Sequence, residues 1–108
     1  MQAKNLEKMI ESGHDSALLR LTLARILIRQ NDLADAATHL EKAVQLDEAY
    51  TAAWNELGKT RRLTGDTPGA AAAWSRGIEI ARQNGDKQAE KEMNVFLRRL
   101  GRVIRRQR

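Results

Sequence analysis

The chain has 108 residues, of which 42% are hydrophobic and only 4% are aromatic, with a single proline, so the composition favours one helical domain. The lack of cysteine excludes disulfide bonds and thiolate metal sites and is typical of a reducing compartment. No apolar run is long enough for a membrane span or a secretory signal, so we expect a cytoplasmic protein.

The net charge of +5 arises at the C-terminal end of the chain. The last eleven residues contain six arginines and no acid, whereas the preceding residues carry 13 basic and 14 acidic side chains. The high isoelectric point is therefore a property of one terminus. The arginines of this basic tail are Arg98, Arg99, Arg102, Arg105, Arg106 and Arg108.

The pattern of apolar and helix-breaking residues predicts six helices, in chain order near residues 3–12, 16–30, 33–46, 51–64, 67–83 and 86–106. Asp32 and Asp86 are expected to cap the third and sixth helices. Thr67 is expected to cap the fifth, with Pro68 at its first helical position. The residues suited to the tight connections between helices are Asn31, Gly65 and Gly85.

Residues 17–50 and 51–84 align as two consecutive segments of equal length, without a gap. Large and small side chains keep their places, since Leu40 aligns with Trp74, and Ala24 with Gly58. Small residues allow two helix axes to approach closely, and large side chains fill the space beside them. The residues expected to pack the helices together, called the packing set below, are Leu23, Ala24, Ala36, Leu40, Ala43, Trp54, Leu57, Gly58, Ala70, Trp74 and Gly77.

A 34-residue period of two helices resembles the tetratricopeptide repeat (TPR) family. The second segment carries the resemblance best, with the residues at the family's signature spacings being Trp54, Leu57, Gly58, Gly65, Asp66, Ala70, Trp74 and Gly77. The first segment has Arg20 in place of the tryptophan, and Glu48 and Arg82 replace the family's proline. The resemblance covers roughly residues 15–100. It implies an all-α, right-handed solenoid of antiparallel helix pairs with N- and C-terminal helical caps.

The flanks of the repeats are expected to close the two ends of the solenoid. Leu6, Met9 and Ile10 stand one full repeat length before apolar positions of the first repeat, so the first helix imitates the second half of a repeat. One face of the last helix carries Ala89, Met93, Phe96, Leu97, Leu100, Val103 and Ile104 at three-and-four spacing. We therefore expect a single domain over 1–108, with a capping helix in 1–14, TPR units at 17–50 and 51–84, and an amphipathic cap with the basic tail in 85–108.

The sequence predicts no catalytic residues, no metal site and no cofactor. His14 and His39 have no ligand at metal-binding spacing and are interpreted as exposed or partly packed side chains. The segment 65–69 lacks the lysine and the spacing of a phosphate-binding loop. We therefore expect a protein that is not an enzyme.

In TPR proteins the first helix of each pair lines a concave groove, so the resemblance implies which side chains face a ligand. They are Leu18, Leu21, Arg25, Ile28, Arg29, Ala52, Asn55, Lys59, Arg62, Leu63, Ala89, Met93 and Phe96. This groove combines apolar side chains with positive charge and suits a protein or peptide partner, whose carboxylates Arg25, Lys59 and Arg62 could contact. Alternatively, Leu21 and Ile28 pack under the N-terminal helix and the charged residues are only solvated.

Some TPR proteins hold the carboxylate terminus of heat-shock chaperones with a clamp of lysines and asparagines. The matching positions here are Leu21, Arg25, Glu56, Asp86 and Glu90. The acidic residues among them would repel an incoming carboxylate, so we do not expect a receptor for chaperone tails.

Two other functions stay open. The basic tail could attract the phosphates of nucleic acid or of an anionic membrane. Against this, the charge is confined to one terminus, the apolar face of the last helix is needed as a cap, and no aromatic residue is interleaved for base stacking. The short solenoid could also self-associate, and its oligomeric state is left open. We expect a protein partner rather than nucleic acid.

Trp74→Ala should lower the free energy of unfolding by roughly 3 to 5 kcal/mol, because it empties the space between two helices of the better-formed repeat. Denaturant unfolding measures this change. A loss below about 1 kcal/mol would mean that Trp74 lies on the surface.

Overall fold

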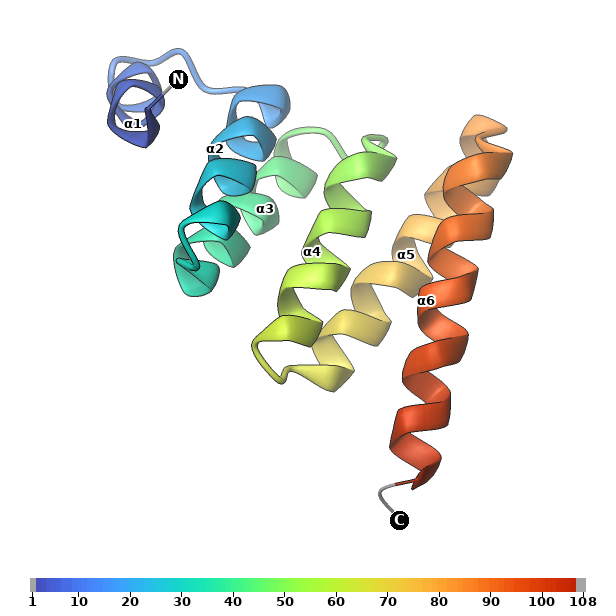
Figure 1. Cartoon of the computed structure of the whole chain (residues 1–108). Coiled ribbons are helices and arrows are strands. Elements are labelled where there is room, and N and C mark those ends of the chain that lie inside the picture. Colours follow the sequence, from blue (N-terminus) through green and yellow to red (C-terminus); the bar gives the residue numbers. More distant parts are fainter. Residues whose placement is uncertain (1, 107–108) are drawn as a thin grey trace.

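The computed structural model describes residues 2–106, and these residues form six helices and no strand (Figure 1). The all-α prediction is confirmed, and each described helix begins and ends within one residue of its predicted range. The helices are α1 (Ala3–Glu11), α2 (Ala17–Arg29), α3 (Leu33–Leu46), α4 (Thr51–Leu63), α5 (Thr67–Asn84) and α6 (Lys87–Arg106).

The helices form a solenoid with two layers (Figure 1). Each helix packs against the next one along the chain, and α2, α4 and α6 also contact one another in series. We call the layer of α2, α4 and α6 the inner face. The molecule is elongated, with extents of 46 × 31 × 19 Å, and the end of α6 projects beyond the helices beside it (Figure 1).

The turns between helices use a left-handed backbone at the predicted residues. The φ angles are 61° at Asn31, 84° at Gly65 and 71° at Gly85. Asn31 and Gly65 occupy equivalent positions of the two repeats, so both repeats make the same turn with the two residue types that best tolerate this conformation.

The prediction that Thr67 caps α5 is wrong. The N-cap residue is Asp66, whose Oδ1 accepts a hydrogen bond from the Gly69 backbone N–H at 2.9 Å. Thr67 and Pro68 are instead the first two helical residues. A carboxylate is a stronger acceptor than a hydroxyl and complements the positive end of the helix, which explains the preference for Asp66.

The other predicted caps behave differently from each other. Asp86 caps α6, because its Oδ1 accepts a hydrogen bond from the Ala89 backbone N–H at 3.1 Å. Asp32 directly precedes α3, but its side chain makes no capping hydrogen bond.

Ten residues of the packing set are buried, and only Trp54 is half-buried. Trp74 has an exposed fraction of 0% and stacks on the Phe96 ring, with the centroids 5.4 Å apart. It lies against Gly58 of α4, where an added Cβ would come 2.5 Å from Trp74 Cε2. The close approach of α4 and α5 therefore depends on a missing side chain facing a large one. Trp54 packs against both apolar clusters of the core.

The first repeat compensates for the absence of its signature tryptophan with hydrogen bonds. Arg20 donates from Nε and Nη2 to the Asp15 carboxylate at 2.8 Å and from Nη1 to His39 Nδ1 at 2.9 Å. The equivalent positions of the second repeat carry Trp54 and Ala73. One repeat thus has a guanidinium and an imidazole where the other has an indole and a methyl group.

The Arg20 contact requires that His39 Nδ1 be unprotonated, because a guanidinium can only donate. Burial, and then the positive charge of Arg20, hold the pKa of His39 below its usual value. His39 therefore has a structural role in the fold.

We predict that the free energy of unfolding falls as the pH drops below about 6.5, the pKa of His39 in the unfolded chain. Below this pH the unfolded chain binds a proton at His39, whereas the folded chain does not, because its His39 has a lower pKa. The free energy of unfolding therefore falls until the pH reaches the pKa of His39 in the folded chain. Urea unfolding at pH of about 7.5 and about 5.5 measures the loss, with carboxylates ionised at both values.

His39→Asn keeps an acceptor oxygen and cannot titrate, so it should remove most of this pH dependence. The control is His14→Asn, which changes an exposed histidine and should keep it. An equal fall in the wild type and in His39→Asn would contradict the prediction.

Two glycine substitutions test the packing of α4 on α5. Gly58→Ala should lower the free energy of unfolding by about 1–3 kcal/mol, because the new methyl group overlaps the Trp74 ring. Gly101→Ala is the matched control, since a Cβ there meets nothing within 4 Å. It should raise the free energy of unfolding by up to about 1 kcal/mol through helix propensity. A similar loss in both variants would refute the packing argument.

Candidate functional site

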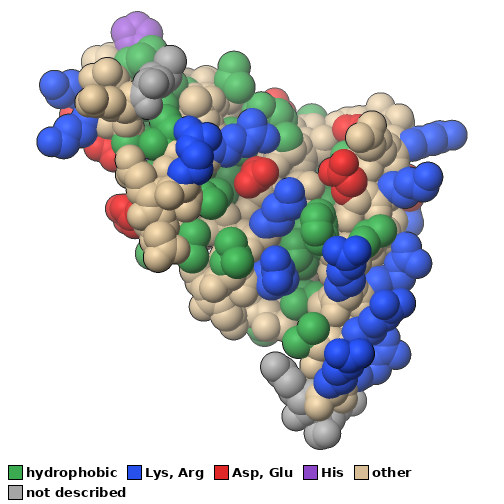
Figure 2. Space-filling model, viewed as in Figure 1, with side chains coloured by type: hydrophobic (Ala, Val, Ile, Leu, Met, Phe, Trp, Pro, Cys, Tyr) green, Lys and Arg blue, Asp and Glu red, His purple; other side chains and the backbone are tan. Residues whose placement is uncertain are grey.

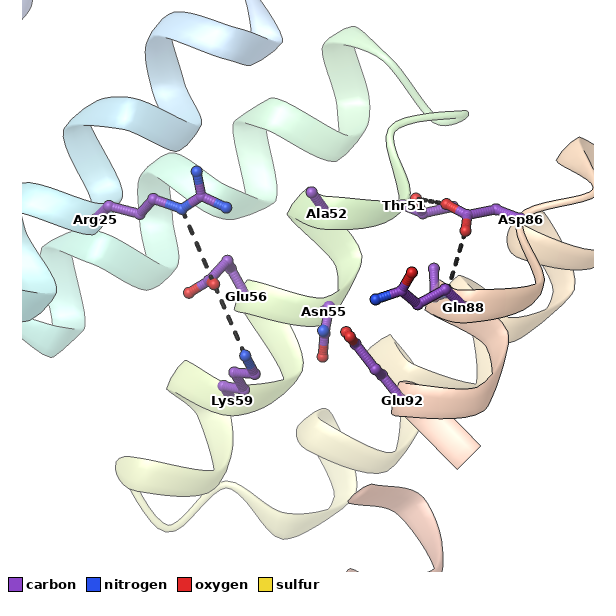
Figure 3. Close-up of a pocket in the computed structure, with 10 residues that line it drawn as sticks. Arg25, Thr51, Ala52, Asn55, Glu56, Lys59, Asp86, Gln88 and Glu92 are labelled. Atoms are coloured by element: carbon purple, nitrogen blue, oxygen red, sulfur yellow. Dashed lines mark hydrogen bonds and ion pairs between the residues drawn. The ribbon is translucent and has the colours of Figure 1, made fainter. Parts of the chain in front are cut away.

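The inner face contains a hollow of about 430 Å³ between α2, α4 and α6, which we call the central hollow (Figure 3). Arg25 reaches it from α2, whereas α4 and the first turns of α6 form its two sides (Figure 3). Its lining residues are Arg25, Thr51, Ala52, Asn55, Glu56, Lys59, Asp86, Gln88, Ala89 and Glu92.

The central hollow carries charges of both signs. Glu56 Oε1 lies between Arg25 Nε at 4.0 Å and Lys59 Nζ at 3.9 Å. Asp86 and Glu92 add two further carboxylates. The predicted groove set contained basic but no acidic side chains, whereas this hollow carries both. Glu56 and Asp86 lie in its lining, in agreement with the acidic positions that argued against a receptor for chaperone tails.

Asn55 is a polar side chain of the hollow whose orientation is fixed by the core. Its exposed fraction is 9%, and its Oδ1 accepts a hydrogen bond from Trp74 Nε1 at 3.1 Å. An indole N–H can only donate, so the contact sets which end of the amide faces the core. No fully buried side-chain nitrogen or oxygen of residues 2–106 lacks a partner, so Asn55 Nδ2, which makes no hydrogen bond within these residues, keeps some contact with solvent. It can donate to a ligand.

The start of α4 is tied to the start of α6 at the edge of the hollow. Thr51 Oγ1 donates to Asp86 Oδ2 at 3.1 Å, while the other Asp86 oxygen caps α6 (Figure 3). This pair of a hydroxyl and a carboxylate therefore holds the two helix ends together and is already satisfied.

Two residues predicted to face a ligand are in the core. Leu21 and Met93 have exposed fractions of 0%, so their assignment to the groove is wrong. Leu21 belongs to the same apolar cluster as Leu6 of α1, which agrees with the alternative interpretation. Met93 lies over Gly77, where its Sδ occupies the space that a side chain would need.

Several other predicted groove residues lie outside the central hollow. Leu18 is 63% exposed and belongs to a small apolar hollow with Met9 beside α1. Leu63 is exposed, Arg29 is exposed and Ile28 is half-buried. The central hollow brings together only Arg25, Ala52, Asn55, Lys59 and Ala89 from the predicted groove.

A further hollow of about 340 Å³ lies where α6 passes the end of α4 and the start of α5. We call it the C-terminal hollow, and its lining residues are Arg62, Thr67, Phe96, Arg99, Leu100 and Val103. Arg62 and Phe96 were predicted to face a ligand, whereas Arg99 and Val103 were assigned to the tail and the cap. Their positions at i+3 and i+7 from Phe96 were the signal that places all three on one side of a helix.

The basic tail is helical through Arg106, and Arg98, Arg99, Arg102, Arg105 and Arg106 are all exposed. Arg108 lies outside the described residues. Across residues 2–106 there is no group of three or more potential metal-ligating side chains, and none of the described helices could cross a membrane.

Comparison with known proteins identifies the repeat. A family model described as tetratricopeptide repeat matches residues 17–60. A TPR repeat-containing protein of Pseudomonas aeruginosa is 48% identical over 103 residues, which are 95% of this chain and 98% of that protein.

Solved structures agree. The solution structure of a protein from Bordetella parapertussis has a TM-score of 0.80 and 42% identity, covering 95% of this chain and 91% of that one. A tetratricopeptide repeat domain protein from Salinibacter ruber shares the fold, with a TM-score of 0.75 and 23% identity. The match covers 80% of this chain and 87% of that protein's chain. TPR proteins generally act as non-enzymatic adaptors in protein–protein interactions. On the sequence identity to its Pseudomonas relative, this chain belongs to the tetratricopeptide-repeat family.

Proposed function

We propose that the chain is an adaptor that binds a segment of another protein along its inner face, in the valley between α4 and α6. The observation that carries this proposal is the central hollow, which is lined by residues of three helices. Asn55 lies in this lining, and a hydrogen bond from the buried Trp74 fixes the orientation of its amide. An amide held in one orientation loses little entropy when it donates to a ligand.

The valley follows the sides of two helices. On α4, Asn55, Lys59 and Arg62 follow one another at i+4 and i+3 spacings, so they lie along one side of the helix. On α6, Phe96 and Val103 continue the side begun by Glu92. The central and C-terminal hollows therefore succeed one another between the same two helices. Such a valley suits an extended or helical segment better than a small molecule.

The lining of the central hollow supports binding rather than catalysis. Among its described residues there is no cysteine or histidine, and the Thr51 hydroxyl is already bonded to Asp86. Glu56 is held between Arg25 and Lys59. These groups can pair with a partner's charges and backbone amides, and we propose no reaction for them.

Site-specific photocrosslinking tests which face binds. A photoreactive phenylalanine at Gln88, an exposed residue that lines the central hollow, should capture a protein from an extract of the source cells. The matched control is the same group at Ser75, an exposed residue of α5 in the outer layer, which should capture little. Mass spectrometry of the adducts gives the readout.

Equal capture from Gln88 and Ser75, or none from Gln88, would refute binding through the inner face. An adduct of two copies of this chain would show self-association through the inner face, in place of binding to another protein.

A further inference from the structure

We propose that the C-terminal hollow is the anchor point of the partner and accepts an apolar side chain flanked by carboxylates, within an acidic segment of another protein. This inference rests on the proposed use of the α4–α6 valley. It adds the chemistry of the ligand at one end of that valley.

The first argument is that the arginines differ in whether they form ion pairs. Most arginines in the body of the molecule are paired with carboxylates: Arg20 with Asp15, Arg25 with Glu56, Arg61 with Glu41, Arg76 with Glu48 and Glu79, and Arg82 with Glu90. By contrast, Arg62 and Arg99 make no ion pair within residues 2–106, and none of the described residues that line the hollow they share is acidic. Two unpaired guanidinium groups beside one hollow create a positive potential that a partner's carboxylates would neutralise.

The second argument is the apolar floor between these arginines. Leu100 is buried, Phe96 is half-buried and Val103 is 48% exposed, so apolar surface continues from the core into the hollow. Its volume of about 340 Å³ lies at the low end of the range for ligand pockets, roughly 300–1,000 Å³. This space suits one anchoring side chain, and Thr67 of α5 adds a hydroxyl group to its lining.

The charge pattern of the valley places an acidic segment at this end. Three carboxylates, those of Glu56, Asp86 and Glu92, line the central hollow and would repel it there. Figure 2 shows acidic side chains near the start of α6 and Lys and Arg side chains gathered along its later turns. Lys59, whose Nζ lies 5.2 Å from the centroid of the Phe96 ring, marks the change from one region to the other.

Nucleic acid and membranes fit the hollow less well than a peptide. Phe96 is the only aromatic ring among the described residues of its lining, and that ring already stacks on Trp74 and lies beneath Lys59, so it is not free to stack on a base. A helix that lies on a membrane must turn its apolar face outward, whereas α6 turns Met93 and Leu100 toward the protein core.

Fluorescence anisotropy with a synthetic probe tests the inference. The probe is a fluorescein-labelled peptide with one leucine between two pairs of glutamates. Replacing Arg62 and Arg99 by glutamate together should weaken its binding about ten-fold or more, as expected when charge-assisted hydrogen bonds are lost. The matched control, Arg98→Glu with Arg105→Glu, makes the same charge change on α6 outside the hollow and should weaken binding less than about three-fold.

The apolar anchor is tested without changing any charge. Val103→Ser, or a serine in place of the probe's leucine, should weaken binding about three- to ten-fold through lost apolar contact. Ile104→Ser changes the adjacent exposed residue, which does not line the hollow, and should leave binding within about two-fold. Circular dichroism checks that each variant is folded.

Several results would overturn the inference: no binding of the probe, equal loss in the two double variants, or tighter binding of duplex DNA or phosphatidylserine vesicles through Arg62 and Arg99. Capture from Gln88 without binding of the probe would overturn the inference and leave the proposed function standing. Failure of capture from Gln88 would remove the valley as the binding site, and this inference with it.

Discussion

The contact between Gly58 and Trp74 is the constraint on which the better-formed repeat depends. The indole fills the space left by the glycine, so α4 and α5 approach closely. The same ring stacks on Phe96 of α6, and its N–H holds the amide of Asn55 on the inner face. One buried side chain thus joins three helices and also orients a group that a ligand would meet.

The duplicated pattern explains why the helices were predictable from the sequence and the site only in part. Equivalent residues of the two repeats, such as Asn31 and Gly65, indicate the same turn in both repeats. The sequence therefore predicted the ends of the helices well. Burial, however, depends on the neighbouring helices. Leu21 became core because α1 extends the apolar cluster around it, and Met93 became core because Gly77 opposite has no side chain.

The ion pairs, like burial, depend on which helices lie next to each other and not on the local sequence alone. The sequence locates the arginines but not their partners, which are mostly supplied by other helices or turns. Arg61 meets Glu41 and Arg82 meets Glu90 across helix boundaries, whereas the arginines of the last turns of α6 make no ion pair within residues 2–106. The net charge of the chain is therefore expressed at one corner of the structure rather than spread over its surface.

The hydrogen bond from Trp74 to Asn55 makes the surface that a ligand would meet depend on the packed interior. Anyone who transplants this inner face onto another repeat scaffold must carry the indole and the glycine beneath it, because an asparagine alone would be free to flip its amide and present oxygen instead of nitrogen. Recognition and folding cannot be engineered separately at this position.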